Sequence, residues 1–436
     1  MLRSSVAGVV WVSALVWAHA AAAQPAPGGA AGAQGGQTQP TAGGQDHSQM
    51  TSPGWHVMQD GVLWITFTDQ TGTRAARQTR SQNWWMLMAQ RPVAGGTFTA
   101  TLMLSAEPFT VGDRGYNELF QLGEASFGPD FFGTRTLLAN VDRQHPHDFV
   151  MQAAVSWRRP IGSRAGLTFA GGPVGEASLG PVAFMHRASA AENPIAPLSH
   201  HTFDATHITN GVVTAAVDYG PWMVEGSIFQ GREPDENRWD FMDPGALDSW
   251  STRASFRSGG WFAQASYGFL EKPERLENVD VRRATASVSW TRERGDDFTA
   301  VSLIGGQNER EFSTLQALTL EATDRRGRLS IYGRFEAVDV ESEHLFFPLV
   351  VHIPHPGELI DTVKVGTIGA VFDVLRIRGL ALGIGGDIQW YGLTDRLRSF
   401  YGEPRTAHVY FRLRPRAPAM GRMFDMTMTS PGHNGR

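Results

Sequence analysis

The feature that most constrains this chain is a two-residue alternation of apolar and polar side chains, repeated in short segments from Trp55 onward. In residues 282–291, RRATASVSWT, one face is apolar and the other carries arginine, serine and threonine. Residues 328–337 and 406–414 repeat this pattern. Successive side chains of a β-strand point to opposite faces, so the alternation predicts strands that are apolar on one face only.

Two observations favour a transmembrane barrel over a soluble β-sandwich. The alternating segments run about 9–11 residues, the length that a tilted strand needs to cross a bilayer. Strands of soluble sandwiches are more often about 5–6 residues long. Short connections such as 220–221 and 257–260 also interleave with long ones such as 231–248 and 339–362. Short turns on one side and long loops on the other are typical of outer-membrane barrels.

The sequence therefore predicts an all-β fold, a transmembrane antiparallel outer-membrane β-barrel of about 16 strands (range about 14–18), with long extracellular loops and short periplasmic turns. The predicted strands are 62–68, 83–91, 97–104, 149–158, 165–171, 208–219, 221–230, 249–257, 260–270, 281–291, 298–307, 313–323, 328–338, 364–373, 378–391 and 405–414. Charged residues on the polar face must point into the lumen, since they are costly in lipid. They are Arg253, Arg257, Arg283, Arg334, Arg412, Arg414, Glu225, Glu321, Glu336 and Asp387.

Composition divides the chain into four parts. Residues 1–23 combine Arg3, an apolar run and a small-residue cleavage site, which predicts a secretory signal peptide. Residues 24–54 are low-complexity Gly, Ala, Gln and Pro, which predicts a disordered periplasmic tail. The barrel is predicted over 55–414, and a flexible, Met-containing C-terminal tail over 415–436. The expected location is the cell outer membrane, reached by export through the signal peptide.

Bulk properties exclude several other classes of protein. The 436 residues contain no cysteine, so the chain has no disulfide framework and no thiolate metal site. After the signal peptide, no stretch has the roughly 18–20 uninterrupted apolar residues of a transmembrane helix. A net charge of −5 argues against a nucleic-acid binder. The expected partners are outer-membrane lipid and small solutes or metal ions.

Two histidine-containing blocks, DRQHPHDF (142–149) and LSHHTFDATH (198–207), fall in the predicted long loops 105–148 and 172–207. Imidazoles mixed with carboxylates suit Zn, Cu(II) or Ni, so Cu or Zn is the cofactor that such loops would take, although the sequence requires none. The candidate metal ligands are His145, His147, Asp148, His200, His201, Asp204 and His207. The spacing H-P-H is no defined zinc signature, and the alternative is that these side chains hydrogen-bond within loops that plug or rim the barrel. Thioethers in HSQM (47–50) and MGRMFDMTM (420–428) suit Cu(I).

The segment HITNG (207–211) offers an enzymatic alternative. It resembles the H-x-S-N motif of outer-membrane lipid hydrolases, in which a histidine activates a serine nucleophile. His207 and Thr209, two residues apart on a strand, would share a face as the catalytic pair. Thr209 stands where the motif has serine, so an enzyme is the less favoured interpretation.

A wider resemblance covers most of the predicted mature chain. The blocks are GWHVMQDG (54–61), NWWM (83–86), RGYNELFQLGE (114–124), DRQHPHDF (142–149), GPVAFMHRASAAENPIAPLSHHTFDATHIT (180–209) and GREPDENRWDF (231–241). They resemble an uncharacterised family of Gram-negative secreted or outer-membrane proteins loosely associated with copper and heavy-metal resistance genes. We expect a pore or envelope protein that handles metal ions such as copper through its histidine loops. The alternatives are the lipid hydrolase and a purely structural barrel with a plugged lumen.

Overall fold

The computed structural model describes residues 54–129, 135–241, 245–274, 278–346, 355–416 and 424–430. The predicted signal peptide, the HSQM segment and nearly all of the predicted N-terminal tail lie outside these ranges. Within them, no helix has the length and apolar character needed to cross a membrane.

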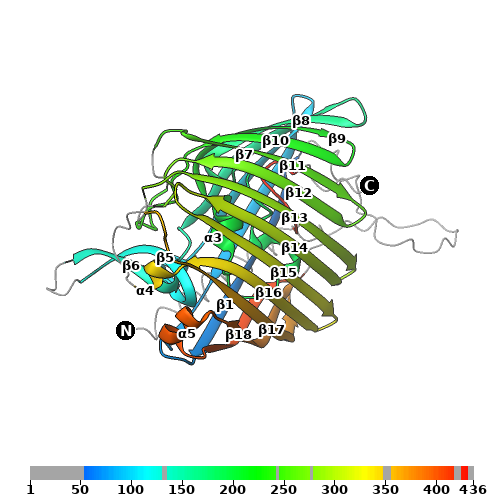
Figure 1. Ribbon diagram of the computed structural model, residues 1–436. Helices are drawn as coiled ribbons and strands as arrows, with labels where there is room; N and C mark the ends of the chain where they lie inside the picture. Colours follow the sequence, from blue (N-terminus) through cyan, green and yellow to red (C-terminus); the bar gives the residue numbers. More distant parts are fainter. Residues whose placement is uncertain are drawn as a thin grey trace.

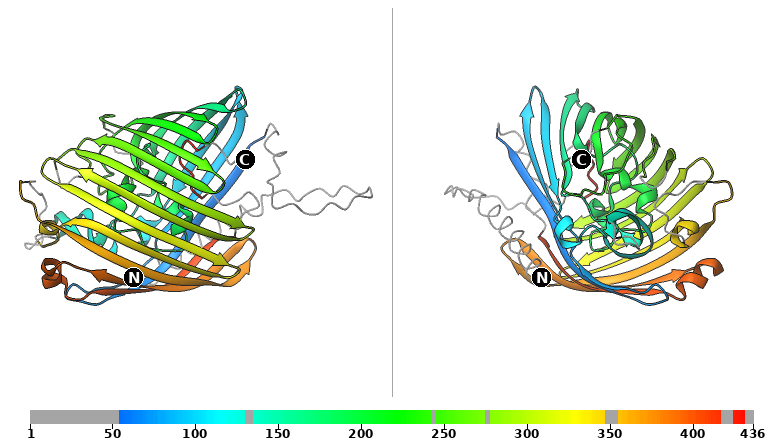
Figure 2. Two further views of the ribbon diagram at one scale, coloured as in Figure 1. Left: turned by 45° about the vertical axis from the view of Figure 1, so that its right-hand side comes forward. Right: turned by 90° about the vertical axis from the view of Figure 1, so that its left-hand side faces the viewer.

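Sixteen antiparallel strands of the described chain form one closed barrel (Figures 1 and 2). They are β1 (His56–Gln70), β3 (Asn83–Val93), β4 (Gly96–Leu104), β7 (Val150–Ile161), β8 (Ala165–Gly175), β9 (Thr209–Tyr219), β10 (Trp222–Phe229), β11 (Ser249–Ser258), β12 (Trp261–Leu270), β13 (Val281–Arg294), β14 (Asp297–Glu309), β15 (Thr314–Arg326), β16 (Leu329–Glu341), β17 (Ile360–Ile377), β18 (Leu380–Gly392) and β19 (Arg405–Pro415). The barrel closes where β1 pairs with β19, with Leu63 opposite Leu413. A short strand, β2 (Arg77–Arg80), pairs with β1 beyond the end of β3 and extends the same wall.

The predicted fold and strand number are confirmed, since each of the sixteen predicted segments corresponds to one barrel strand with shifted ends. Tight connections close one end of the barrel, here called the tight-turn end. Gly220, Gly295 and Gly327 lie in these turns with φ of 58°, 62° and 55°, which glycine adopts without a steric penalty. The longer connections all lie at the opposite end, here called the long-loop end, as the alternation of short and long connections predicted.

The barrel wall has an apolar outer face and a polar inner face. Val217, Leu320 and Phe411 stand on the outer face, each about half exposed. Eight of the ten predicted lumenal charges are buried inside the barrel: Arg253, Arg283, Arg334, Arg412, Glu225, Glu321, Glu336 and Asp387. Of the other two, Arg414 is half-buried and Arg257 is exposed. An apolar exterior around a charged interior is the arrangement that a strand-built membrane protein requires.

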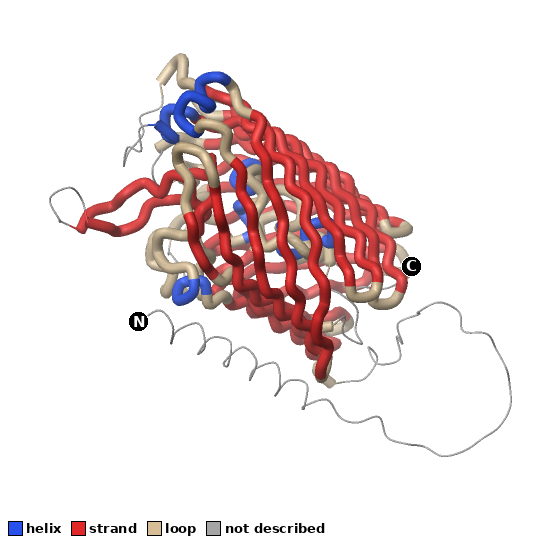
Figure 3. Tube along the Cα trace, turned by 90° about the horizontal axis from the view of Figure 1, so that it is seen from below, coloured by secondary structure: helices blue, strands red, loops and turns tan. Residues whose placement is uncertain are grey.

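The connection between β8 and β9 folds into the barrel, where it forms what we call the plug, residues 176–208 (Figure 3). It contains four short helices: η2 (Phe184–His186), η3 (Ala188–Ala190), α3 (His200–Phe203) and η4 (Ala205–His207). The long connection predicted over 172–207 is present, and it folds inward, as the alternative of loops that plug the barrel describes. Its main chain hydrogen-bonds to polar side chains of the inner wall, with Ser178 N donating to Ser227 Oγ (2.9 Å) and Gly180 N to Ser266 Oγ (2.8 Å).

Other connections cover the long-loop end. The strands β5 (Tyr116–Pro129) and β6 (Arg135–Gln144) form a separate two-stranded sheet that projects away from the barrel in Figure 1. Three helices complete this end: α2 (Glu107–Thr110), α4 (Ser342–Phe346) and α5 (Asp395–Tyr401). The sequence patterns did not predict these elements, because their pairing and burial depend on neighbouring loops.

The predicted C-terminal tail begins at Pro415, which still belongs to β19, and its second described part, residues 424–430, packs inside the barrel. Arg257 Nη2 donates to the main-chain oxygen of Asp425 (2.5 Å), and Met428 N donates to Glu176 Oε2 (3.3 Å). Met426 packs against buried methionines of the wall. The polar groups of this segment therefore find partners in the lumen, and the flexibility of the tail stays a prediction.

Candidate functional site

A buried ion network holds the plug against the wall. Arg187 Nε donates to Glu321 Oε1 of β15 (2.7 Å), and Arg187 Nη1 donates to Asp204 Oδ2 of the plug (2.6 Å). None of the three side chains is more than 2% exposed. Because Asp204 separates α3 from η4, this bridge fixes the segment that carries His200, His201 and His207.

Five histidines converge at the long-loop end of the lumen. Their ring centroids form a continuous row: His145 to His201 at 5.4 Å, His201 to His200 at 5.4 Å, His200 to His207 at 5.1 Å, and His207 to His147 at 5.7 Å. Two of the rings come from the stretch between β6 and β7, and three come from the plug. The structure thus brings together all five histidines of the two blocks; we call them the histidine row.

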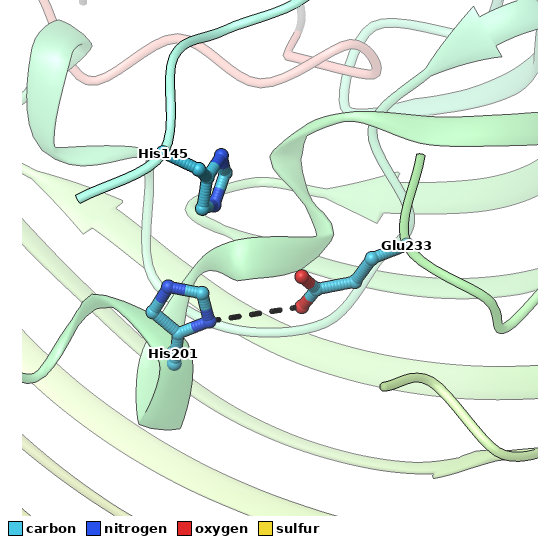
Figure 4. A group of neighbouring side chains, drawn as sticks. All are labelled: His145, His201 and Glu233. Carbon is cyan, nitrogen blue, oxygen red and sulfur yellow. Dashed lines mark ion pairs between the residues drawn. The ribbon is translucent and has the colours of Figure 1, made fainter. Parts of the chain in front are cut away.

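One end of the histidine row has the geometry of a metal site. One ligand atom each from His145, His201 and Glu233 lies within 4.8 Å of the others (Figure 4). The Nδ1 atom of His201 is 4.0 Å from Glu233 Oε1 and also 4.0 Å from Glu274 Oε1. Two imidazoles and a carboxylate, with a second carboxylate adjacent, form a nitrogen and oxygen donor set that suits Zn(II) or Cu(II).

Hydrogen bonds fix the tautomer of the remaining rings. Nδ1 of His207 donates to the main-chain oxygen of Asp204 (2.8 Å), and Nδ1 of His200 donates to Asp204 Oδ1 (2.7 Å). Nδ1 of His147 donates in the same way to Glu107 Oε2 (3.0 Å). A neutral imidazole whose Nδ1 carries the proton presents a lone pair at Nε2, which is how histidines are usually held for metal binding.

Two of the Nε2 atoms are buried without a hydrogen-bond partner, those of His201 and His207. A bound ion or a water molecule would supply the partner that each of these two atoms lacks within the protein. His207 also borders a cavity of about 20 Å³, together with His145, His147, His200 and others. This space is large enough for one ion or one water molecule.

Burial keeps three rings of the row, those of His145, His201 and His207, uncharged near neutral pH. Burial lowers the pKa of His201 to about 3, assisted by the neighbouring His200 and Arg283. Burial also lowers the pKa of His145 and of His207 well below the usual value, with further contributions from Arg238 to the first and from His200 to the second. Neutral imidazoles are the form that coordinates a metal ion.

Two predicted ligands have other partners, and three site residues were missed. Asp148 accepts a hydrogen bond from Arg238 Nη1 (3.0 Å), and Asp204 is shared between Arg187 and His200, so both carboxylates orient other groups. The missed residues are Glu107, Glu233 and Glu274. Of these, Glu233 lies in the block GREPDENRWDF, whose presence beside the histidine blocks was the available signal.

The proposed catalytic pair does not have the predicted geometry. His207 belongs to η4, and β9 begins only at Thr209, so the two side chains do not share a strand face. The Thr209 hydroxyl is buried and donates to the main-chain oxygen of Thr206 (2.9 Å). The prediction that the two residues lie on one strand is therefore wrong, because the chain is still helical at His207.

No protein-family model matches the chain, and no curated protein matches it. The family resemblance suggested by the sequence blocks therefore stays a prediction.

The chain is similar in structure to a loop-deletion mutant of OmpT, an outer membrane protein of Vibrio cholerae. The identity is 8%, the alignment covers 82% of this chain and 99% of that chain, and the TM-score is 0.48. For Salmonella typhi OmpF in a complex with daunomycin, the identity is 8%, the coverage 82% and 97%, and the TM-score 0.48. For an anion-selective porin from Comamonas acidovorans, the identity is 12%, the coverage 83% and 99%, and the TM-score 0.46. Identities this low leave the function to be inferred from the residues of this chain.

Proposed function

We propose that this chain is an envelope protein of the outer membrane whose β-barrel binds a divalent transition-metal ion, Cu(II) or Zn(II), inside its lumen. The apolar outer face of the barrel suits contact with lipid hydrocarbon. The observation that carries the metal assignment is the convergence of His145, His201 and Glu233 at the end of the histidine row. The unpartnered Nε2 atoms of His201 and His207 support it, since a bound cation would satisfy such atoms.

The residues that surround the row support its use as a ligand set. Asp204 and Glu107 each hold an imidazole by its Nδ1 atom, which is the role that outer carboxylates have in many metal sites. Metal binding would also tie the plug to the connection between β10 and β11, because Glu233 belongs to that connection. A bound ion would therefore stabilise the plug inside the barrel.

The test is a titration of the refolded mature chain, freed of metal by a chelator, with Cu(II) and with Zn(II). We expect stoichiometric binding and an affinity at least tenfold lower in the double variant His201→Ala and His207→Ala. The control is His355→Ala, because His355 is exposed and interacts with Glu343 away from the row. The proposal fails if the wild-type chain binds neither ion, or if the double variant binds as tightly as the control.

A further inference from the structure

Seven of the chain's 14 methionines gather at one place inside the barrel, which we call the methionine cluster. Four are buried residues of the wall: Met86, Met88, Met103 and Met151. Three more pack against them: Met58, Met185 and Met426. They come from β1, β3, β4, β7, the plug and the C-terminal segment, so their proximity is a property of the tertiary structure.

Strand register places four of these methionines in two directly opposite pairs. Met58 of β1 lies directly opposite Met88 of β3, and Met86 of β3 lies directly opposite Met103 of β4. Directly opposite residues have Cβ atoms about 4.5–5.5 Å apart. Methionine has three flexible side-chain bonds, so sulfur atoms on such neighbouring positions are able to meet around one ion.

The methionines are not explained by the need for apolar filling. On the same strands, the neighbouring outward positions are leucine, at Leu87 and Leu102. Elsewhere the inward residues are polar, as at Thr285 of β13, or are aliphatic where they are apolar, as at Ile304 of β14 and Val338 of β16. Leucine fills space as well as methionine does, so the sequence places sulfur specifically on the inner face of this sector.

A cavity of about 80 Å³ adjoins both the methionine cluster and the histidine row. It is lined by His147 and Glu107 from the row's surroundings and by Trp84, Met185 and His186 from the cluster's side. The ring of His186 packs edge-on against Trp84, with centroids 4.9 Å apart. Burial lowers the pKa of His186 to about 4, so this imidazole is neutral as well.

We propose that the methionine cluster binds a soft monovalent cation, Cu(I) or Ag(I), through its thioether sulfurs. Thioethers select such ions and bind hard divalent ions weakly. The site differs in chemistry from the histidine row, which offers nitrogen and oxygen donors. It therefore stands whether or not the row binds a divalent ion.

The experiment is an anaerobic titration of the refolded chain with preformed Cu(I), in competition with a colorimetric Cu(I) chelator, and a parallel titration with Ag(I). We expect stoichiometric binding of both ions. The fourfold variant Met58→Leu, Met86→Leu, Met88→Leu and Met103→Leu should bind at least tenfold more weakly. The matched control is Met223→Leu, because Met223 is a half-buried residue of β10 outside the cluster. Equal affinity in the fourfold variant and the control, or no binding by the wild-type chain, overturns the proposal.

X-ray absorption of the Ag(I)-loaded wild-type chain gives an answer that does not depend on the folding of a variant. A first shell that contains sulfur supports the proposal, and a shell of nitrogen and oxygen alone refutes it. Repeating the Cu(I) titration on the His201→Ala and His207→Ala variant separates the two sites. Retained Cu(I) binding supports a distinct site, and complete loss assigns the Cu(I) to the histidine row and overturns the methionine site.

Discussion

The ion pair between the plug and the wall allows the docking of the plug to be tested by one substitution, Arg187→Ala. The guanidinium of Arg187 neutralises Glu321 of the wall and Asp204 of the plug, and all three side chains are buried. The substitution leaves two carboxylates without their main cation. Each keeps a weaker partner: Arg334 lies 3.4 Å from Glu321, and His200 still donates to Asp204.

Breaking a buried ion pair by removing one partner typically costs about 3–5 kcal/mol. The remaining partners place this case near the lower value, about 3 kcal/mol, which corresponds to a change of roughly 100-fold in the docking equilibrium of the plug. The control is Arg282→Ala. The pair Arg282–Glu309 is exposed and 3.7 Å long, so its loss should cost less than about 1 kcal/mol.

The assay is hydrogen exchange of the refolded barrel, followed by mass spectrometry over residues 184–207. We expect plug amides, such as Asp204 N, which donates to His200 O, to exchange roughly 100-fold faster in Arg187→Ala. The barrel strands should keep their protection, and Arg282→Ala should behave as wild type. Unchanged plug exchange would refute the assigned role of Arg187. Equal loss of protection in plug and strands would refute the view that the plug opens separately from the wall.

Three further substitutions test other parts of the structure. Glu107→Gln should weaken Cu(II) or Zn(II) binding by about 10–100-fold, because the carboxylate that holds His147 is lost. An unchanged metal titration would exclude His147 from the ligand set. Leu320→Arg should destabilise the barrel by about 2–4 kcal/mol in lipid, measured by reversible urea unfolding, since Leu320 is central on the outer face of β15; a neutral result would contradict a lipid-facing position. Gly180→Ala should loosen the plug by about 1–3 kcal/mol, because Gly180 has φ of 92° and its Cβ would lie 2.1 Å from Phe203 O. Gly226→Ala has no such clash and should leave hydrogen exchange of the plug unchanged.

The strands were predictable because the pattern that defines them is local. A strand of a membrane barrel faces lipid at one residue and the lumen at the next. The apolar Val409 and the polar His408 therefore indicate which face each side chain lies on, even when the residues that contact them are not known. The plug lacks such a pattern. It mixes buried apolar residues such as Phe203 with polar ones at no fixed period, and whether they face water or the inner wall depends on partners such as Ser227 and Glu321, far away in the sequence.

The site was predictable in composition and only partly in geometry. Two blocks concentrated the histidines, and imidazole chemistry made them metal candidates. The roles of Asp148 and Asp204 could not be predicted from the sequence. Whether a carboxylate binds a metal or orients another side chain depends on its neighbours in the tertiary structure. Glu233 was missed for the same reason, since it reaches the row from a different connection.

By itself, the sequence determined the closed strand-built wall, with its number of strands, its two faces and its alternating short and long connections. Periodicity and segment length are sufficient to predict these features, because each strand contacts lipid with one face and the lumen with the other. Only the tertiary structure decided what the lumen contains. The folding of the β8–β9 connection into the barrel aligned five imidazoles, and strand register set Met58 opposite Met88 and Met86 opposite Met103. Contacts between residues that are distant in the chain create these sites, and no local pattern encodes such contacts.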